Sequence, residues 1–200
     1  MGTKRRLWFY QLVAMSCLAL AGLGVISAQA QDKRMGRANR EVYRGNIFYL
    51  GGQRGSNADF FTMTVDSFTP DSEVEQLLSA LKSGGQDGLK RALGDRKRGT
   101  VQIGNRLSRD IQAVWVTQTD EGRKIYALSE RWLGFAEVRR GARSVDYPFT
   151  FIELYVEDDG KGEGSLIPAA QVRAKKGMTL EVENFGIYPA RITNLKQTRK

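Results

Sequence analysis

The chain of 200 residues contains no histidine and a single cysteine, Cys17. Histidine is the usual general base near neutral pH and the commonest metal ligand, and cysteine supplies the thiolate of many nucleophilic and metal sites. Their scarcity excludes Ser-His-Asp catalysis, Cys-His catalysis, and zinc or copper sites built on these residues. Carboxylate pairs, Ser-Lys dyads and oxygen-ligated calcium or magnesium remain open, and the sequence gives no pattern from which we predict a metal or a cofactor. One cysteine forms no intramolecular disulfide, so the fold must depend on a hydrophobic core, which a chain of this length can build in one domain.

The first thirty residues have the pattern of a secretory signal peptide. Three basic residues at positions 4–6 precede an almost wholly apolar run, residues 12–26, and an Ala-x-Ala cleavage site at residues 28–30. The apolar run is shorter than the about 20 residues of a membrane-spanning helix, although residues 7–10 could extend it into a retained anchor. We expect residues 1–30 to be removed and the protein to be exported, either periplasmic or secreted, with membrane contact only through this peptide.

Basic side chains outnumber acidic ones, 31 to 22, which gives a net charge of +9. Removal of residues 1–30 would leave 28 against 22, a net charge of +6. Clusters that converge on one face could bind a polyanion; the alternative is an ordinary solvated surface. Nucleic acid is not expected, because aromatic residues do not interleave with the clusters as base stacking requires. The clusters are Lys33, Arg34, Arg37 and Arg40; Arg96, Lys97 and Arg98; Arg139, Arg140 and Arg143; Arg173, Lys175 and Lys176; and Lys196, Arg199 and Lys200.

The rest of the chain divides into a basic arm and one β-rich domain. Residues 31–41 are polar, basic and aperiodic, and we expect a flexible arm. Beyond them apolar and polar residues alternate, as over residues 61–65, which is typical of half-buried strands. Residues 42–200 are therefore predicted to form a single domain, with mostly hairpin-connected antiparallel strands.

One region of this domain, about residues 70–94, has helical periodicity. Four aliphatic residues from Val74 to Leu81 recur at i, i+3, i+4 and i+7, which places them on one helix face. The pair Gly84-Gly85 divides the region and Gly94 ends it, so we predict a helical hairpin. The predicted fold is mainly β (α+β): an antiparallel β-barrel or sandwich of about eight strands, with the hairpin inserted after the second strand.

Several predicted strands carry apolar residues on both faces. A small closed barrel has one inward set, and this set could surround a small apolar ligand. Trp115, Phe151 and Tyr155 are the candidate ligand-binding residues. The alternative is that one apolar face fills the core while the other packs under the helical hairpin.

Carboxylates are the main groups left for catalysis. Glu153, Glu181 and Glu183 lie on predicted strands, where a glycosidase-type pair could be placed. No residue is assigned a catalytic role, because acids on the polar face of a strand are ordinary. The segment 158–160 reads Asp-Asp-Gly and is interpreted as a hairpin turn, since the ligand spacing of an EF-hand calcium loop is absent.

These patterns predict an exported, non-catalytic binding protein of the cell envelope or secreted space. It would hold a small apolar or amphiphilic ligand, or bind an envelope component. The alternatives are a carboxylate-dependent hydrolase of a cell-envelope polymer and a polyanion-binding surface protein. The oligomeric state stays open.

Overall fold

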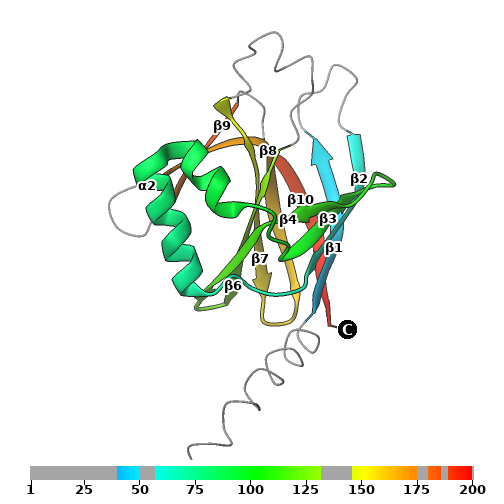
Figure 1. Cartoon of the computed structure of the whole chain (residues 1–200). Coiled ribbons are helices and arrows are strands. Elements are labelled where there is room, and N and C mark those ends of the chain that lie inside the picture. Colours follow the sequence, from blue (N-terminus) through cyan, green and yellow to red (C-terminus); the bar gives the residue numbers. More distant parts are fainter. Residues whose placement is uncertain (1–39, 50–56, 132–145, 175–179, 186–188, 200) are drawn as a thin grey trace, which may run out of the picture. The chain divides into compact units, whose positions relative to one another are not determined.

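The computed structural model describes residues 40–49, 57–131, 146–174, 180–185 and 189–199 (Figure 1). The signal peptide predicted for residues 1–30 lies outside the described residues, as does the predicted arm except for Arg40 and Glu41.

Within these ranges the chain forms ten strands and one helix, all in the unit Asn39–Lys200. The elements are β1 (Glu41–Tyr49), β2 (Asn57–Val65), α2 (Asp71–Leu93), β3 (Gly99–Ile103), β4 (Arg109–Ile111), β5 (Ala113–Thr119), β6 (Gly122–Glu130), β7 (Phe149–Glu157), β8 (Lys161–Ala174), β9 (Leu180–Asn184) and β10 (Ala190–Arg199). No helix in the described part of the chain is long and apolar enough to cross a membrane.

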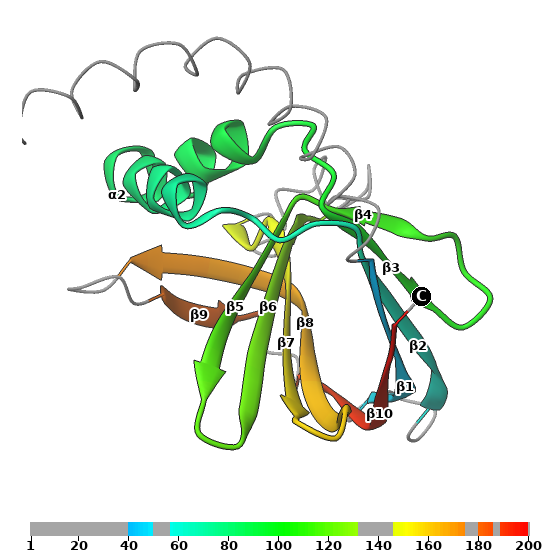
Figure 2. The same ribbon diagram turned by 90° about the horizontal axis from the view of Figure 1, so that it is seen from below.

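All ten strands belong to one antiparallel sheet. Its order is β4-β3-β2-β1-β10-β8-β7-β6-β5, and β9 pairs with the end of β8. Figure 2 shows the curl of this sheet, with β1 to β4 on one side, β5 to β8 on the other, and β10 between them. The two outermost strands, β4 and β5, are separated in the chain by Gln112 alone, whose N–H donates to the Leu128 carbonyl oxygen at 3.1 Å. The edges meet there, but in the described part of the chain no pairing of β4 with β5 closes the sheet into a barrel.

Apolar side chains fill the inner face of the curled sheet. Successive residues of a strand point to opposite faces, so each strand contributes every second residue. Phe61, Met63 and Val65 of β2 are all buried there, as their alternation predicts. The other members of this inner cluster are Tyr43, Ile47, Val101, Ile111, Val114, Ile125, Ala127, Ile152, Leu154, Val156, Leu166, Ala190, Ile192 and Leu195.

The helix α2 bends at Gly85, whose φ of 58° and ψ of −147° lie outside the helical region. Glycine adopts such a conformation without steric cost. Beyond the bend the chain packs against the first half of the helix, because a Cβ on Gly88 would lie 2.3 Å from the Ala80 carbonyl oxygen. The predicted helical hairpin is not confirmed: helical structure continues on both sides of Gly85 without a separate loop, as one bent helix. Gly94, with φ of 51°, ends the helix as predicted.

One face of α2 covers the outer face of β5 to β8. Next to the bend, Gln86 links α2 to β8 by two hydrogen bonds. Its side-chain amide donates to the Val172 carbonyl oxygen and accepts from the Val172 N–H at 3.1 Å. The outer cluster consists of Leu77, Leu81, Leu89 and Leu93 of the helix and of Ala113, Leu128, Phe149, Phe151, Ala170 and Val172 of the sheet. The part of β5 to β8 that α2 covers is therefore buried on both faces, which explains why these strands carry apolar residues on both.

The predicted mainly β, antiparallel fold is confirmed. Of the two predicted architectures, the barrel is wrong because the described sheet stays open, and the sandwich is not seen because the described strands all belong to one sheet. The strand count is ten instead of about eight. One of the ten is the short strand β4, which Gln112 alone separates from β5.

Candidate functional site

A groove of about 490 Å³ lies between the first half of α2 and the outer face of β5 to β8. Seven of its ten lining residues are aliphatic or aromatic, and three are polar. They are Val74 and Leu78 of α2, Trp115 and Thr117 of β5, Tyr126 of β6, Phe151 and Glu153 of β7, Ser165 and Ile167 of β8, and Val182 of β9.

Strand pairing aligns the central residues of this groove. Trp115 is the register partner of Tyr126, Tyr126 of Glu153, and Glu153 of Ser165. These four side chains form one row across β5, β6, β7 and β8 on the face that α2 covers. The preceding row on this face includes Phe151 and its register partner Ile167, which also line the groove at the edge of the part of the sheet that α2 covers.

Three aromatic rings form the floor of the groove. The ring centroids of Trp115 and Tyr126 are 5.5 Å apart with planes inclined by 23°. The ring of Phe151 lies 6.1 Å from Tyr126 and 6.3 Å from Trp115. Centroid separations of this size are those of favourable aromatic pairs, so the rings support one another as a preformed surface.

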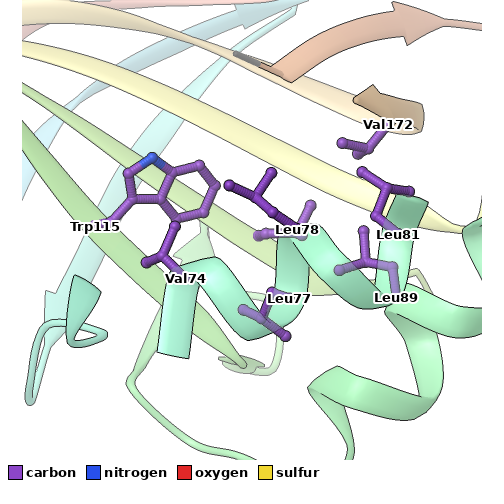
Figure 3. A pocket seen from close by; sticks show the side chains of 8 residues that line it. Val74, Leu77, Leu78, Leu81, Leu89, Trp115 and Val172 are labelled. Atoms are coloured by element: carbon purple, nitrogen blue, oxygen red, sulfur yellow. The ribbon is translucent and has the colours of Figure 1, made fainter. Parts of the chain in front are cut away.

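The groove continues under α2 as a narrow apolar slot of about 20 Å³. Val74, Leu78 and Trp115 line both spaces. Figure 3 shows Trp115 beside Val74, Leu78 on the side of the helix where Trp115 lies, and Val172 near Leu81. Every described residue that lines the slot is apolar, so this end of the groove presents hydrocarbon and aromatic surface.

The opposite end of the groove is polar. The Glu153 carboxylate lies 3.4 Å from the Lys124 ammonium, and their side chains are 38% and 42% exposed. Burial raises the pKa of the Tyr126 phenol; the charge of Glu153 raises it further, and Lys124 opposes this effect. The hydroxyls of Thr117 and Ser165 complete this end.

The structure brings together two of the three predicted ligand-binding residues. Trp115 and Phe151 line the groove, whereas Tyr155 lies one row farther out, as the register partner of Lys124, and is not part of the lining. Tyr126 belongs to the site but was not singled out from the sequence. Its place on the same face as Trp115 follows from the register of β5 with β6, which a single sequence does not give.

The three acids considered for hydrolysis do not meet. Glu153 lines the groove, whereas Glu181 and Glu183 alternate with Val182 on β9 and therefore face away from it. On that opposite face Glu183 lies 2.9 Å from the Arg173 guanidinium and accepts a hydrogen bond of 3.0 Å from the Tyr147 hydroxyl.

The described basic clusters are largely paired with acids. Arg96 and Arg98 both bind Glu73, the first at 2.6 Å. Ion pairs also join Lys97 to Asp110 at 2.7 Å and Arg40 to Asp66 at 3.1 Å. The cluster at residues 139–143 and several members of the other clusters lie outside the described residues.

The Asp-Asp-Gly segment forms the turn between β7 and β8, as predicted. Asp159 accepts hydrogen bonds from the Lys161 N–H at 2.9 Å and from the Lys161 ammonium at 2.6 Å. Gly160 has a φ of 82°, which suits its place in the turn. In the ranges that the structure covers, no group of three acidic, histidine or cysteine side chains could hold a metal ion.

A second hollow, of about 410 Å³, is lined by Ser108, Arg109, Asp110, Gln112, Glu130 and Arg131 where β4 meets β6. Its described lining residues are all polar or charged, and its two acids, Asp110 and Glu130, form ion pairs with Lys97 and Lys90.

The groove therefore combines a rigid aromatic floor, an apolar slot and a polar end with one carboxylate. Such a surface can hold an elongated molecule by burying its apolar part and hydrogen bonding its polar part. Comparisons with protein-family models, with curated proteins and with solved structures find no match for this chain.

Proposed function

We propose that this protein is an exported, non-catalytic binding protein that holds a small amphiphilic ligand in the groove between α2 and the sheet. The observation that carries the proposal is the groove's polarity: its lining is apolar beneath α2 and polar at Glu153, Ser165 and Thr117. Its volume of about 490 Å³ lies in the range of small-molecule sites. Export rests on the signal-peptide pattern of residues 1–30.

The same geometry favours binding over hydrolysis. Glycoside hydrolysis ordinarily uses two carboxyl groups about 5–10 Å apart on either side of the bond that is cleaved. Among the described residues that line the groove, Glu153 is the only carboxylate. Glu181 and Glu183, on the opposite face of the sheet, cannot act with it. The ion pairs of the described basic clusters likewise give no support to polyanion binding.

Native mass spectrometry of the protein purified gently from the exported fraction of its own host tests the proposal. We expect a bound mass of a few hundred daltons that leaves on denaturation. A bare protein mass from that fraction, together with no binding of a neutral alkyl glycoside, would contradict a ligand-binding groove.

A pair of aromatic substitutions tests the place of the site. Trp115→Ala removes the residue shared by the groove and the slot, so the dissociation constant for decyl maltoside should rise about tenfold or more, as for other buried aromatic anchors. Tyr155→Ala is the matched control, because Tyr155 lies on the same face of the sheet but does not line the groove. We expect its dissociation constant to change by less than about twofold. Isothermal titration calorimetry measures both constants, and circular dichroism checks that both variants are folded. Equal losses in the two variants would place the site elsewhere.

A further inference from the structure

The described sheet has three edge strands, β4, β5 and β9. The free edge of a strand can pair with another strand, and proteins commonly block such edges with charged residues, proline, bulges or short strands. β4 is three residues long and contains Arg109 and Asp110. β9 contains Glu181 and Glu183. β5 is seven residues long, contains neither proline nor a charged residue, and pairs with β6 without a register shift. Among the described strands β5 is therefore the edge that nothing in its sequence blocks.

One contact identifies the free backbone groups of β5, which ends the curled sheet in Figure 2. On the side away from β6, the Val114 N–H donates to the Thr69 hydroxyl at 2.9 Å, and the Thr69 N–H donates to the Val114 carbonyl oxygen at 2.6 Å. The backbone groups of every second residue in a strand point the same way, so those of Val116 and Gln118 also point away from β6. In the described part of the chain these groups have no hydrogen-bond partner, and the side chains of residues 117–119 are exposed.

Two copies of β5 are complementary along this edge. When two antiparallel β5 strands pair about a two-fold axis at Thr117, Val116 of each copy lies opposite Gln118 of the other. Each of these residue pairs exchanges two hydrogen bonds, so every free N–H and C=O of Val116 and Gln118 gains a partner. Thr117 lies opposite Thr117 of the second copy, and threonine pairs across strands are favourable. No like charges meet, because β5 carries no charge.

The two ends of β5 select this register. In it, the position opposite Val114 belongs to the turn 120–121 of the second copy, and that turn leaves β5 toward β6, away from the shared edge. The turn therefore does not compete with Thr69 for the place beside Val114. A register shifted by two residues in one direction places Gln118 opposite Val114, whose groups Thr69 already occupies. The opposite shift leaves Val116 facing the turn.

We propose that two copies of this protein pair through the free edge of β5, antiparallel and in register about Thr117, so that their sheets become continuous. Two residue pairs with two hydrogen bonds each make a small interface, so the dimer is weak and depends on concentration. Thr117 also lines the groove, so Thr117 of the second copy lies beside the groove's open side. The proposal goes beyond the proposed function and does not depend on what the groove binds.

Sedimentation velocity of the protein purified from the exported fraction of its own host measures the association. We expect a reversible monomer–dimer equilibrium with a dissociation constant of about 1–100 µM. Gln118→Pro removes one N–H donor of the free edge, where proline is tolerated because that N–H does not bind β6. This variant should associate about tenfold more weakly, and circular dichroism checks that it is folded.

Charges at the two-fold axis test the register. Thr117→Lys or Thr117→Glu places like charges opposite each other, so each variant alone should associate about tenfold more weakly. An equimolar mixture of the two variants places opposite charges there and should form a heterodimer, a recovery that damage to the fold would not produce. Ser79→Lys and Ser79→Glu are the matched controls, because Ser79 is exposed on α2, and neither should change the association.

The outcomes decide between the possible partners of the edge. A monomer at every concentration would overturn the dimer and leave the groove proposal standing, since no ligand is involved. Dimers that persist in both Thr117 variants, or a mixture that associates no better than either variant alone, would place the interface elsewhere and overturn the proposal. A monomeric wild type that co-purifies with another protein, which Gln118→Pro loses, would replace the second copy by an extended segment of that protein.

Discussion

At the scale of single residues, a buried polar cluster crosses the inside of the curled sheet. Arg123 of β6 donates to the Glu41 carboxylate and to the Tyr43 hydroxyl of β1, both at 2.8 Å, and the Tyr43 hydroxyl donates to Glu41. Tyr43 is fully buried, and the Glu41 side chain is only 13% exposed. Because β1 and β6 are not neighbours in the sheet, the cluster ties its two sides together.

This cluster predicts a specific alkaline sensitivity. Burial raises the pKa of the Tyr43 phenol far above its ordinary value, and Glu41 adds to the effect, whereas Arg123 opposes it. The stabilisation is complete below the unfolded pKa near 10 and declines as the pH rises beyond it, because only the unfolded chain then releases the proton. Tyr43→Phe should lower the free energy of unfolding at neutral pH by about 0.5–1.5 kcal/mol, through the lost hydrogen bonds.

The same variant should lose less stability than the wild type between about pH 9 and about pH 11, since the phenol is absent. Urea titrations at a series of pH values measure the difference. Tyr49 and Tyr126, whose pKa values are also raised, remain in both proteins and cancel in the comparison. Parallel curves for wild type and variant would show that Tyr43 ionises in the folded protein as readily as in the unfolded chain.

Residue patterns predicted part of the site and missed part of it. Trp115 and Phe151 were selected because they are large aromatic residues on strands with two apolar faces, and both line the groove. Tyr155 shares those properties but lies one row beyond the lining, and Tyr126 was missed. Whether such a residue lines the groove depends on the register between strands and on how much of the sheet α2 covers. Both are set by contacts between residues far apart in the sequence.

At the scale of elements, the glycines of α2 have different roles. A Cβ on Gly88 would meet the Ala80 carbonyl oxygen at 2.3 Å, whereas a Cβ on Gly84 would have the mobile end of Arg91 at 3.6 Å as its nearest neighbour. Gly88→Ala should therefore destabilise the protein by about 1–3 kcal/mol, because backbone must move to admit the methyl group. Thermal unfolding followed by circular dichroism measures this change.

Gly84→Ala is the matched control, because it makes the same chemical change in the same helix without the clash. Alanine is the better helix former, so this variant should gain up to about 1 kcal/mol. If Gly88→Ala were equally stabilising, the two halves of α2 would not be in backbone contact.

Local signals predicted the elements better than their connections. Alternation identified β2, and a glycine with positive φ ends α2 at the expected place. Thr69, just before α2, does not cap the helix: its hydroxyl accepts a hydrogen bond of 2.9 Å from the Val114 N–H, and Pro70 takes the N-cap position. Threonine is a common helix cap, but the fold places β5 beside Thr69, and its hydroxyl binds a backbone N–H of that strand instead.

At the scale of the whole molecule, one sheet supports two hydrophobic clusters. The strands β5 to β8 contribute alternate residues to the inner cluster and to the outer cluster under α2. The number of predicted strands favoured a barrel or sandwich, whereas apolar residues on both faces of these strands were also expected if one face packed under the helical region, as it does here. The difference is set by whether β4 and β5 pair, and Gln112 between them leaves too little chain for a hairpin.

Sharing the sheet should make the two clusters unfold together. Met63→Ala in the inner cluster and Leu81→Ala in the outer cluster should each lower the free energy of unfolding by about 2–5 kcal/mol. Because the two residues lie on opposite faces of the sheet and share no partner, their effects should add to within about 0.5 kcal/mol in the double variant. Far-ultraviolet circular dichroism reports the sheet in urea titrations, and near-ultraviolet circular dichroism reports the packing of the groove's aromatic rings.

For all three variants we expect the far- and near-ultraviolet signals to change at the same urea concentration. The dependence of the free energy of unfolding on urea concentration should equal that of the wild type. Loss of the near-ultraviolet signal of Leu81→Ala at lower urea than the far-ultraviolet signal would mean that α2 leaves the sheet separately. The distinction bears directly on binding, since Val74 and Leu78 of α2 form one wall of the groove. If α2 unfolds only together with the sheet, that wall is already in place when no ligand is present. The proposed binding of an alkyl probe would then lose no free energy to the ordering of α2.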